Sequence, residues 1–167
     1  MCIRDSYNAN LRYTKERTVV IISDAMRYEV GQELFARMQD DPKCSAQLNV
    51  ELGVLPSYTR LGMAALLPHR TLEMTDDFQV LVDGTLCDTL AGRQQVLQSY
   101  VPDSVCIQFD VIKSMKVADL RDVLTKRQVI YVYHNQIDAR GDKPNTEDEV
   151  FNACEEAVQE IMDLIRR

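Results

Sequence analysis

Two stretches of the chain are unbroken runs of β-branched and other apolar residues, at 18–23 and 128–133. Such runs are typical of strands that are buried on both faces of a parallel sheet. The first run ends at Asp24, and apolar residues then recur at every fourth position, which predicts the buried face of a helix. These positions are Met26, Val30, Leu34 and Met38. A strand, an acidic residue and a helix therefore follow one another closely.

Further strands and helices are predicted along the rest of the chain. Residues 47–55 alternate between apolar and polar side chains, which predicts a second strand with its apolar residues on one face. Thr146 and Glu149 fit a capping box at the start of a last helix, which continues to Arg167. The remaining predicted elements are helices at 61–67, 93–100 and 117–125 and short strands at 80–82 and 105–109. Alternating strands and helices indicate an α/β fold with a largely parallel sheet flanked by helices.

Composition narrows the class of protein. The 19 basic and 26 acidic residues give a formal charge of −7, which argues against direct binding of nucleic acid by this segment. No apolar run approaches the roughly 20 residues that span a bilayer, and the first ten residues lack the apolar region of a secretory signal. The five cysteines are scattered without metal-like spacing, so we expect free thiols in a reducing cytoplasm.

Polar residues that could bind a ligand or take part in catalysis follow the ends of the predicted strands. Asp24 follows the first strand, the turn at 57–59 follows the second, and a polar loop at 134–142 follows the strand at 128–133. Ligands of open α/β sheets gather at the carboxyl ends of the strands, so these groups meet if the strands are neighbours.

Each candidate also has a structural interpretation. Asp24 could be the N-cap of the helix that follows it, a metal ligand, or both, since one carboxylate has two oxygens. Thr59 is either a hydroxyl nucleophile at a helix N-terminus or, together with Ser57, a capping residue. Arg60 either pairs with a phosphate oxygen or points into solvent.

The loop at 134–142 offers three more potential ligands. His134, Asp138 and Asp142 are spaced four residues apart, and their nitrogen and oxygen donors suit a divalent ion. The spacing is equally compatible with a solvated acidic loop before a capped helix. The sequence alone leaves both interpretations open.

Three motifs taken together resemble the PglZ family. They are VIISDAMRYE at 20–29, GVLPSYTRLGM at 53–63 and YVYHNQIDARGD at 131–142, in this order. The family belongs to bacteriophage-defence systems of the BREX type and is placed in the alkaline-phosphatase superfamily. The match looks closest to its type A, phosphatase-like member.

The resemblance implies roles for the candidate residues. Asp24 looks like the first metal-ligand aspartate of the superfamily, Thr59 like the nucleophile that also touches metal, and Asp138 like a later ligand. Asp142 stands where relatives usually have a histidine, and His134 either substitutes as a ligand or supports the site. The expected cofactor is a divalent metal, Zn²⁺ by preference with Mn²⁺ or Mg²⁺ as alternatives, and two ions in the intact protein. Arg60 would bind the phosphate of the substrate.

The resemblance also predicts how the chain is organised. We expect residues 1–17 to be a disordered or spurious leader and residues 18–167 to be the front part of an alkaline-phosphatase-like domain. The superfamily completes its site with an Asp-His pair and a further histidine, but this sequence has no histidine after His134. We therefore expect a chain truncated at its C-terminus, which binds metal weakly and is inactive alone.

The implied function is metal-dependent hydrolysis of a phosphate ester, either a monoester or a diester, within the defence system. Its partners would be the other components of that system. The alternative is a non-catalytic scaffold that holds the defence complex together.

Overall fold

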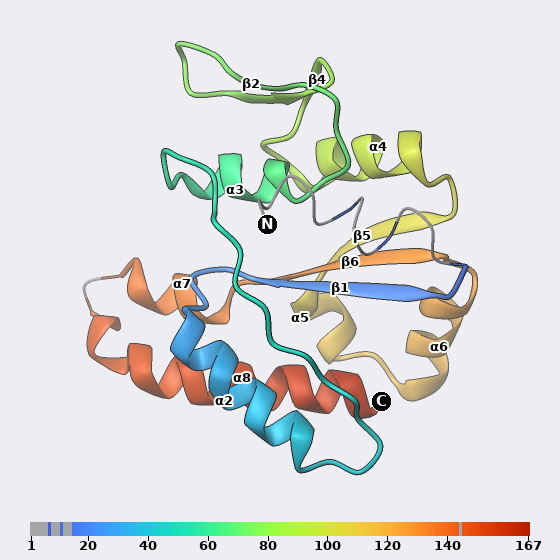
Figure 1. The fold of residues 1–167 in the computed structure, drawn as a ribbon, viewed down its shortest axis with the longest axis vertical. Helices are drawn as coiled ribbons and strands as arrows, with labels where there is room; N and C mark the ends of the chain where they lie inside the picture. Colours follow the sequence, from blue (N-terminus) through green and yellow to red (C-terminus); the bar gives the residue numbers. More distant parts are fainter. Residues whose placement is uncertain (1–6, 8–10, 12–14, 144) are drawn as a thin grey trace.

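A computed structural model describes residues 7, 11, 15–143 and 145–167 of the chain. Its main sheet has three parallel strands in the order β1–β6–β5. These strands are Thr18–Ser23 (β1), Ser104–Gln108 (β5) and Val129–His134 (β6). Helices cover both faces of the sheet (Figure 1), so the predicted α/β class with a parallel sheet is confirmed.

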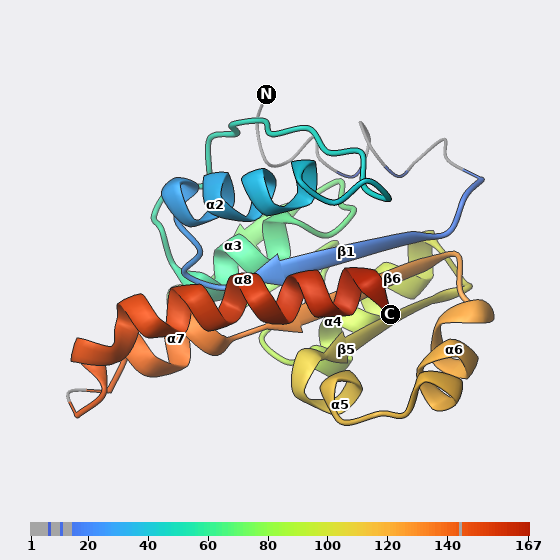
Figure 2. The ribbon, with the colours of Figure 1, turned by 90° about the horizontal axis from the view of Figure 1, so that it is seen from below.

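The central strand β6 is buried along its whole length, and its side chains alternate between the two faces of the sheet. Val129, Tyr131 and Tyr133 belong to a core under helices α3 (Thr59–Ala65) and α4 (Leu90–Tyr100). Ile130 and Val132 belong to a second core on the opposite face. Figure 2 shows the helices of that face, α5 (Phe109–Lys113), α6 (Val117–Thr125) and α8 (Val150–Arg166).

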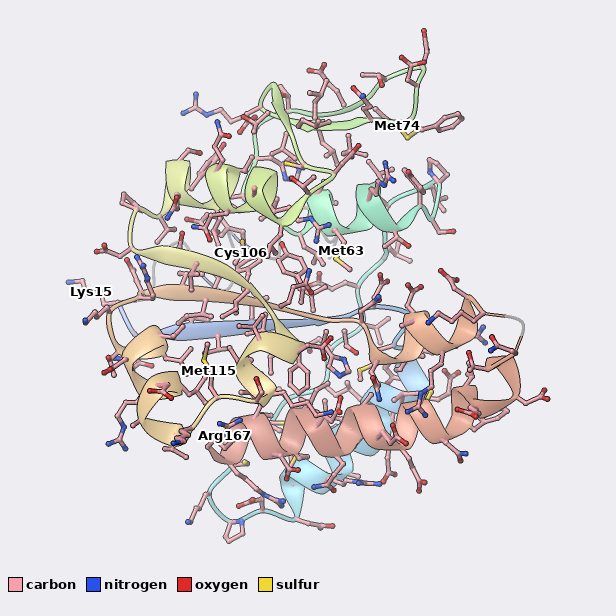
Figure 3. All side chains as sticks on the ribbon, turned by 180° about the vertical axis from the view of Figure 1, so that it is seen from behind. Lys15, Met63, Met74, Cys106, Met115 and Arg167 are labelled. Carbon is pink, nitrogen blue, oxygen red and sulfur yellow. The ribbon has the colours of Figure 1, made fainter. Side chains whose placement is uncertain are left out.

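The labelled side chains in Figure 3 mark the two layers. Met63 and Cys106 point into the space between the sheet and the α3–α4 layer, and Met115 lies on the opposite side near Arg167. The alternation along β6 therefore decides which side chains meet α3 and α4 and which meet α8.

A small antiparallel sheet lies beyond α3 and α4 (Figure 1). It consists of Leu72–Met74 (β2), Val80–Val82 (β3) and Thr85–Leu86 (β4). The turn between β3 and β4 uses Asp83 and Gly84 with positive φ angles of 49° and 78°. The Asp83 carboxylate accepts hydrogen bonds from the backbone amides of Arg70 and Thr71, at 2.9 and 2.8 Å, and thereby ties this sheet to the chain that leads into it.

The helix predicted after Asp24 is α2 (Tyr28–Gln39), and it packs on α8. Its apolar residues at 30, 34 and 38 are only half-buried, and no residue of the helix is fully buried. Beside it, β1 has no strand partner on its outer edge within the described part of the chain. A cavity of about 960 Å³ runs along that edge.

The prediction of a strand at 47–55 is wrong. Apart from an isolated β-bridge at Leu52, the segment is irregular, and it pairs with neither sheet. Val50 and Leu52, on the predicted apolar face, are 67% and 77% exposed. An alternating pattern stabilises a strand only where a neighbouring edge and a core are available.

Two other local predictions are also wrong. The polar loop after His134 contains a short helix, α7 (Gln136–Gly141). The capping box is not formed: Thr146 precedes a 3₁₀ turn at Glu147–Glu149 (η2), and its hydroxyl donates to the Arg140 carbonyl at 2.9 Å. The last helix therefore begins at Val150, with Glu149 as its N-cap.

The other predicted elements correspond to α3, β3, α4, β5, α6 and β6 within a few residues. Four cysteines lie within the described residues, and all four are free, as predicted; Cys2 lies outside them. None of the helices among the described residues has the length and apolar character needed to cross a membrane. The predicted leader at 1–17 falls largely outside the described residues, although Leu11 packs into the core under α3 and α4.

Candidate functional site

A cavity of about 530 Å³ lies between the end of β1, the start of α3 and the start of α7. Three of the predicted site residues line it: Asp24, Thr59 and Asp138. They come from three segments that are far apart in the sequence. The expectation that these three residues meet is therefore correct, although the segment before Thr59 is not a strand.

Asp24 directly follows β1, and its backbone amide donates to the His134 carbonyl at 2.9 Å, which extends the β1–β6 pairing. Its Oδ1 accepts a hydrogen bond from the Ala25 amide at 3.0 Å. Helix α2 begins at Tyr28 with Arg27 as its N-cap, so the interpretation of Asp24 as a cap is wrong.

Burial of the Asp24 carboxyl is the main cause that raises its pKa, and the charge of Asp142 adds to the increase. The Ala25 amide and the Arg93 guanidinium lower the pKa in part. A half-buried carboxylate with a raised pKa, beside other acids, is a common feature of metal and catalytic sites.

Thr59 is the first residue of α3, and buried Leu61, Met63 and Ala64 anchor this helix on the sheet. Tyr58 is the N-cap, and it makes no side-chain capping bond. Among the described residues, no hydrogen bond involves the hydroxyl of Thr59 or Ser57. The capping interpretation therefore has no support, and the exposed Thr59 hydroxyl is available to a ligand in the cavity.

Asp138 and Asp142 lie one helical turn apart, and the Asp142 amide donates to the Asp138 carbonyl at 3.0 Å. Burial raises the pKa of the Asp138 carboxyl, and the charges of Asp24 and Asp142 raise it further. Asp142 lines a neighbouring cavity of about 680 Å³ that shares Ala25 and Asp138 with the first. The three carboxylates thus act on one another electrostatically.

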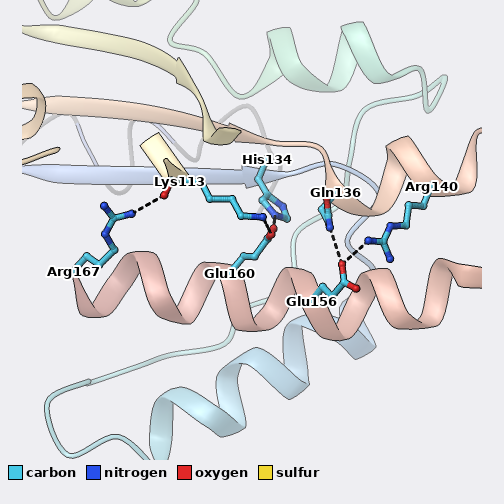
Figure 4. A network of polar contacts seen from close by, with 7 residues as sticks. All are labelled: Lys113, His134, Gln136, Arg140, Glu156, Glu160 and Arg167. Atoms are coloured by element: carbon cyan, nitrogen blue, oxygen red, sulfur yellow. Dashed lines mark hydrogen bonds and ion pairs between the residues drawn. The ribbon is translucent and has the colours of Figure 1, made fainter. Parts of the chain in front are cut away.

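His134 lies apart from these carboxylates, because its position in β6 directs it to the α8 face of the sheet. Its ring is 1% exposed and contacts Phe109 edge-on. Nδ1 lies 2.9 Å from the Ser23 hydroxyl, and Nε2 lies 3.0 Å from the Glu160 carboxylate, which also pairs with Lys113 (Figure 4). Both ring nitrogens are used by protein groups, so His134 supports the end of β1 in this structure.

Arg60 lies away from the cavity. Its Nη1 pairs with the Asp88 carboxylate at 3.2 Å, and the Arg60 side chain is half exposed. The structure therefore does not bring Arg60 together with Asp24 and Asp138. Its predicted role in phosphate binding stays a prediction.

Arg93 of α4 is a charged residue near the site that the sequence analysis did not select. Its guanidinium lies over the Tyr133 ring, 4.6 Å from the ring centre, and its charge lowers the pKa of Asp24. Gly92, directly before it, lies outside the helix predicted at 93–100 but inside the observed α4, where a glycine costs roughly 1 kcal/mol relative to alanine. Such a glycine indicates a close packing contact at that point.

A divalent ion is compatible with the donors that line the cavity. Asp24, Asp138 and the Thr59 hydroxyl offer oxygen ligands. A cation would favour the charged form of both carboxyls, whose pKa values are raised first by burial and then by neighbouring negative charge. Across the described residues, however, no three His, Cys, Asp or Glu side chains are close enough to hold a metal by themselves. By themselves, these residues could therefore supply only part of a ligand set.

The fold and the cavity define an α/β domain with acidic groups and an exposed threonine at the ends of its parallel strands. The chain belongs to the family described as the BREX system PglZ alkaline phosphatase-like domain, whose model matches residues 4–167. The predicted family is therefore confirmed.

Two curated relatives agree with the family. The chain is 41% identical over 151 residues to an "Alkaline phosphatase-like protein PglZ" of Bacillus cereus (strain H3081.97). It is also 41% identical over 154 residues to an "Alkaline phosphatase-like protein BrxZ" of Escherichia coli O9:H4 (strain HS). These matches cover 90% and 91% of this chain but only 18% of each relative. No solved structure matches the chain.

Proposed function

We propose that this chain carries part of the active site of a metal-dependent phosphate-ester hydrolase that acts in a BREX-type phage-defence system. One observation carries the proposal: the exposed Thr59 and two carboxylates with raised pKa values line the same cavity. Membership of an alkaline-phosphatase-like family supports the reaction class. The partners would be the other components of the defence system.

In this proposal, Thr59 is the nucleophile. Its hydroxyl loses a proton to a water molecule or buffer base, and its oxygen forms a bond to phosphorus while the bond to the ester oxygen breaks. The alcohol leaves with a proton taken from solvent. Water then attacks the same phosphorus atom, phosphate is released, and the Thr59 hydroxyl is restored.

The carboxylates prepare the site for this reaction. Asp24 and Asp138 would hold a divalent ion, with Asp142 close enough to add to their negative field. A bound ion would lower the pKa of the attacking hydroxyl and stabilise charge on the phosphoryl oxygens. Because all these donors are oxygens and His134 is engaged by Ser23 and Glu160, Mn²⁺ or Mg²⁺ suits them better than the Zn²⁺ expected from the family.

One observation favours the scaffold function. Among the described residues, no three His, Cys, Asp or Glu side chains lie close enough together to hold a metal ion. The two functions make different predictions for Thr59. A scaffold does not need its hydroxyl, whereas a hydrolase with this nucleophile does.

The test is a chimera in which this chain replaces the matching segment of the Bacillus cereus relative. Thr59→Val keeps the shape of the side chain and removes the hydroxyl, and Thr85→Val in β4 is the matched control. Hydrolysis of p-nitrophenyl phosphate and bis(p-nitrophenyl) phosphate is measured with Mn²⁺, beside phage plating in cells.

We expect the chimera to hydrolyse one of the two esters, and Thr59→Val to lose at least about 100-fold of that activity. Its solubility and circular-dichroism spectrum should match those of the chimera, and its phage defence should fail. Full defence by the Thr59→Val chimera would reject the hydrolase and favour the scaffold. The preferred ester would decide between monoester and diester chemistry.

A further inference from the structure

We propose that the outer edge of β1 is a docking surface for a further β-strand. In a polypeptide as long as the curated relatives, this strand comes from outside the matched segment, which makes up 18% of each relative. The inference goes beyond the proposed function and does not rest on it, because it holds for a hydrolase and for a scaffold alike.

The backbone groups of β1 are paired on one edge and open on the other. The amides of Thr18 and Asp24 donate at 2.9 Å to carbonyls in and directly before β6, so the even-numbered residues of the strand bond to β6. Successive residues of a strand direct their N–H and C=O groups to opposite edges, so those of Val19 and Ile21 point away from β6. Among the described residues, neither amide has a hydrogen-bond partner. Such an edge is a template for another strand.

Helix α2 lies where it would cover that strand. Figures 1 and 2 together place α2 in the same layer as α8, on the far side of β1 from β6. Tyr28, Gly31 and Leu34, which follow one another at helical spacing, line the cavity along the β1 edge. Leu34 is only half-buried, and Tyr28 is 47% exposed. A strand beside β1 would bury this face of α2.

The cavity of about 960 Å³ along this edge has the lining that a buried strand requires. On one face of the sheet it is lined by Ile161 and Leu164 of α8. On the other face it is lined by Leu66, which packs against the core under α3 and α4. Because both walls are apolar, the docked strand would carry apolar residues on both of its faces, as β6 does.

The charged residues that line this cavity are Arg17, Arg27 and Arg167, and no acidic residue of the described part of the chain joins them. Arg17 and Arg167 donate to backbone carbonyls, so their charges are not neutralised by these contacts. Charge complementarity therefore indicates acidic residues beside the ends of the docked strand. A second copy of β1 fits less well, because it would bring the same arginines to the interface.

The experiment is amide hydrogen exchange, measured residue by residue on this chain and on its chimera with the Bacillus cereus relative. The amides of Val20 and Ile22 belong to the alternate set, which includes the β6-bonded amide of Thr18, and serve as the internal control. Sedimentation of the isolated chain at several concentrations is measured in parallel, because it detects pairing between two copies.

We expect the amides of Val19 and Ile21 to exchange at least about 100-fold more slowly in the chimera than in this chain, whereas those of Val20 and Ile22 are protected in both. The isolated chain should sediment as a monomer. Outward amides that exchange equally fast in both proteins would overturn the proposal. Protected outward amides in the isolated chain would also overturn it: a dimer would show that a second copy occupies the edge, and a monomer that the edge is already covered.

A measurement on the chimera alone covers the case in which the isolated chain does not fold. Val19→Lys places a charge on the β1 edge, and Val111→Lys in α5 is the matched control, because the two valines are 42% and 49% exposed. Lysine on a strand edge opposes pairing with another strand. Val19→Lys should therefore raise the exchange rate of the Ile21 amide by at least about ten-fold, and Val111→Lys should leave it unchanged. An unchanged rate in Val19→Lys would overturn the proposal.

Discussion

His134 gives a clear prediction about stability, because the structure makes it a support of the fold. His134→Ala removes a buried ring that contacts the Ser23 hydroxyl, the Glu160 carboxylate and the Phe109 ring. A lost neutral hydrogen bond costs about 1 kcal/mol, and a lost bond to a charged group costs about 1.5–3 kcal/mol. The cavity left by the ring adds to this, so we expect a total of about 3–5 kcal/mol.

The assay is urea unfolding followed by circular dichroism, with His69→Ala as the matched control. His69 lies in a loop, and within the part of the chain that the structure describes its ring makes one hydrogen bond, between Nδ1 and the Leu67 carbonyl at 2.7 Å. Its replacement should cost about 1 kcal/mol or less. Since whole domains are stable by only about 5–15 kcal/mol, the difference between the two variants is readily measured.

Equal and small losses for His134→Ala and His69→Ala would refute this reasoning. If His134→Ala were as stable as the unmodified chain but lost Mn²⁺ binding, then His134 would be a ligand that turns toward the metal. The family resemblance allows that role, whereas the hydrogen bonds of the structure favour the structural one.

Two further predictions concern packing and pH. Gly92→Ala should lower the free energy of unfolding by about 1–3 kcal/mol, because the added Cβ atom would collide with the Leu86 carbonyl oxygen. Thermal unfolding measures this loss, and unchanged stability would contradict the close packing of α4 on β4. Although burial raises the pKa of Glu160, the Lys113 and His134 contacts lower it below 4.5 overall. Its contribution to stability is therefore present above its unfolded pKa and is lost as the pH falls through its lower folded pKa. In Glu160→Gln, the free energy of unfolding should fall less steeply as the pH is lowered through this range. The same decrease in the variant and in the unmodified chain would contradict this prediction.

Much of the fold could be predicted from the sequence, because local patterns and tertiary packing agree there. β1 and β6 are runs of mostly β-branched and aromatic residues, which are typical of strands that are covered on both faces. This prediction is correct for β6, but β1 is an edge strand in which Val19 is exposed. The segment at 47–55 shows the limit of this reasoning. Its alternation has the correct period, but Val50 and Leu52 stay exposed and the segment joins neither sheet.

The candidate site was predictable in part for a similar reason. Asp24 and Asp138 follow from the rule that ligands gather at the carboxyl ends of parallel strands. Thr59 lies on the same cavity although no strand precedes it, so the rule selected it through a strand that does not form. Period-two alternation along β6 would have directed His134 away from them, since Tyr133 and His134 must face opposite sides. Arg93, whose charge acts on Asp24, could not be found by this rule, because it comes from the first turn of α4 and not from the end of a strand.

The central claim is that Asp24 and Thr59 belong to one metal-dependent catalytic cavity, and metal binding tests it most directly. The measurement is calorimetric titration of Mn²⁺ and Zn²⁺ into the chimera with the Bacillus cereus relative, beside its Asp24→Ala variant and an Asp122→Ala control at an exposed position of α6. We predict tight binding that Asp24→Ala abolishes and Asp122→Ala preserves. A folded chimera that binds no divalent ion, or one whose binding survives Asp24→Ala, would contradict the claim.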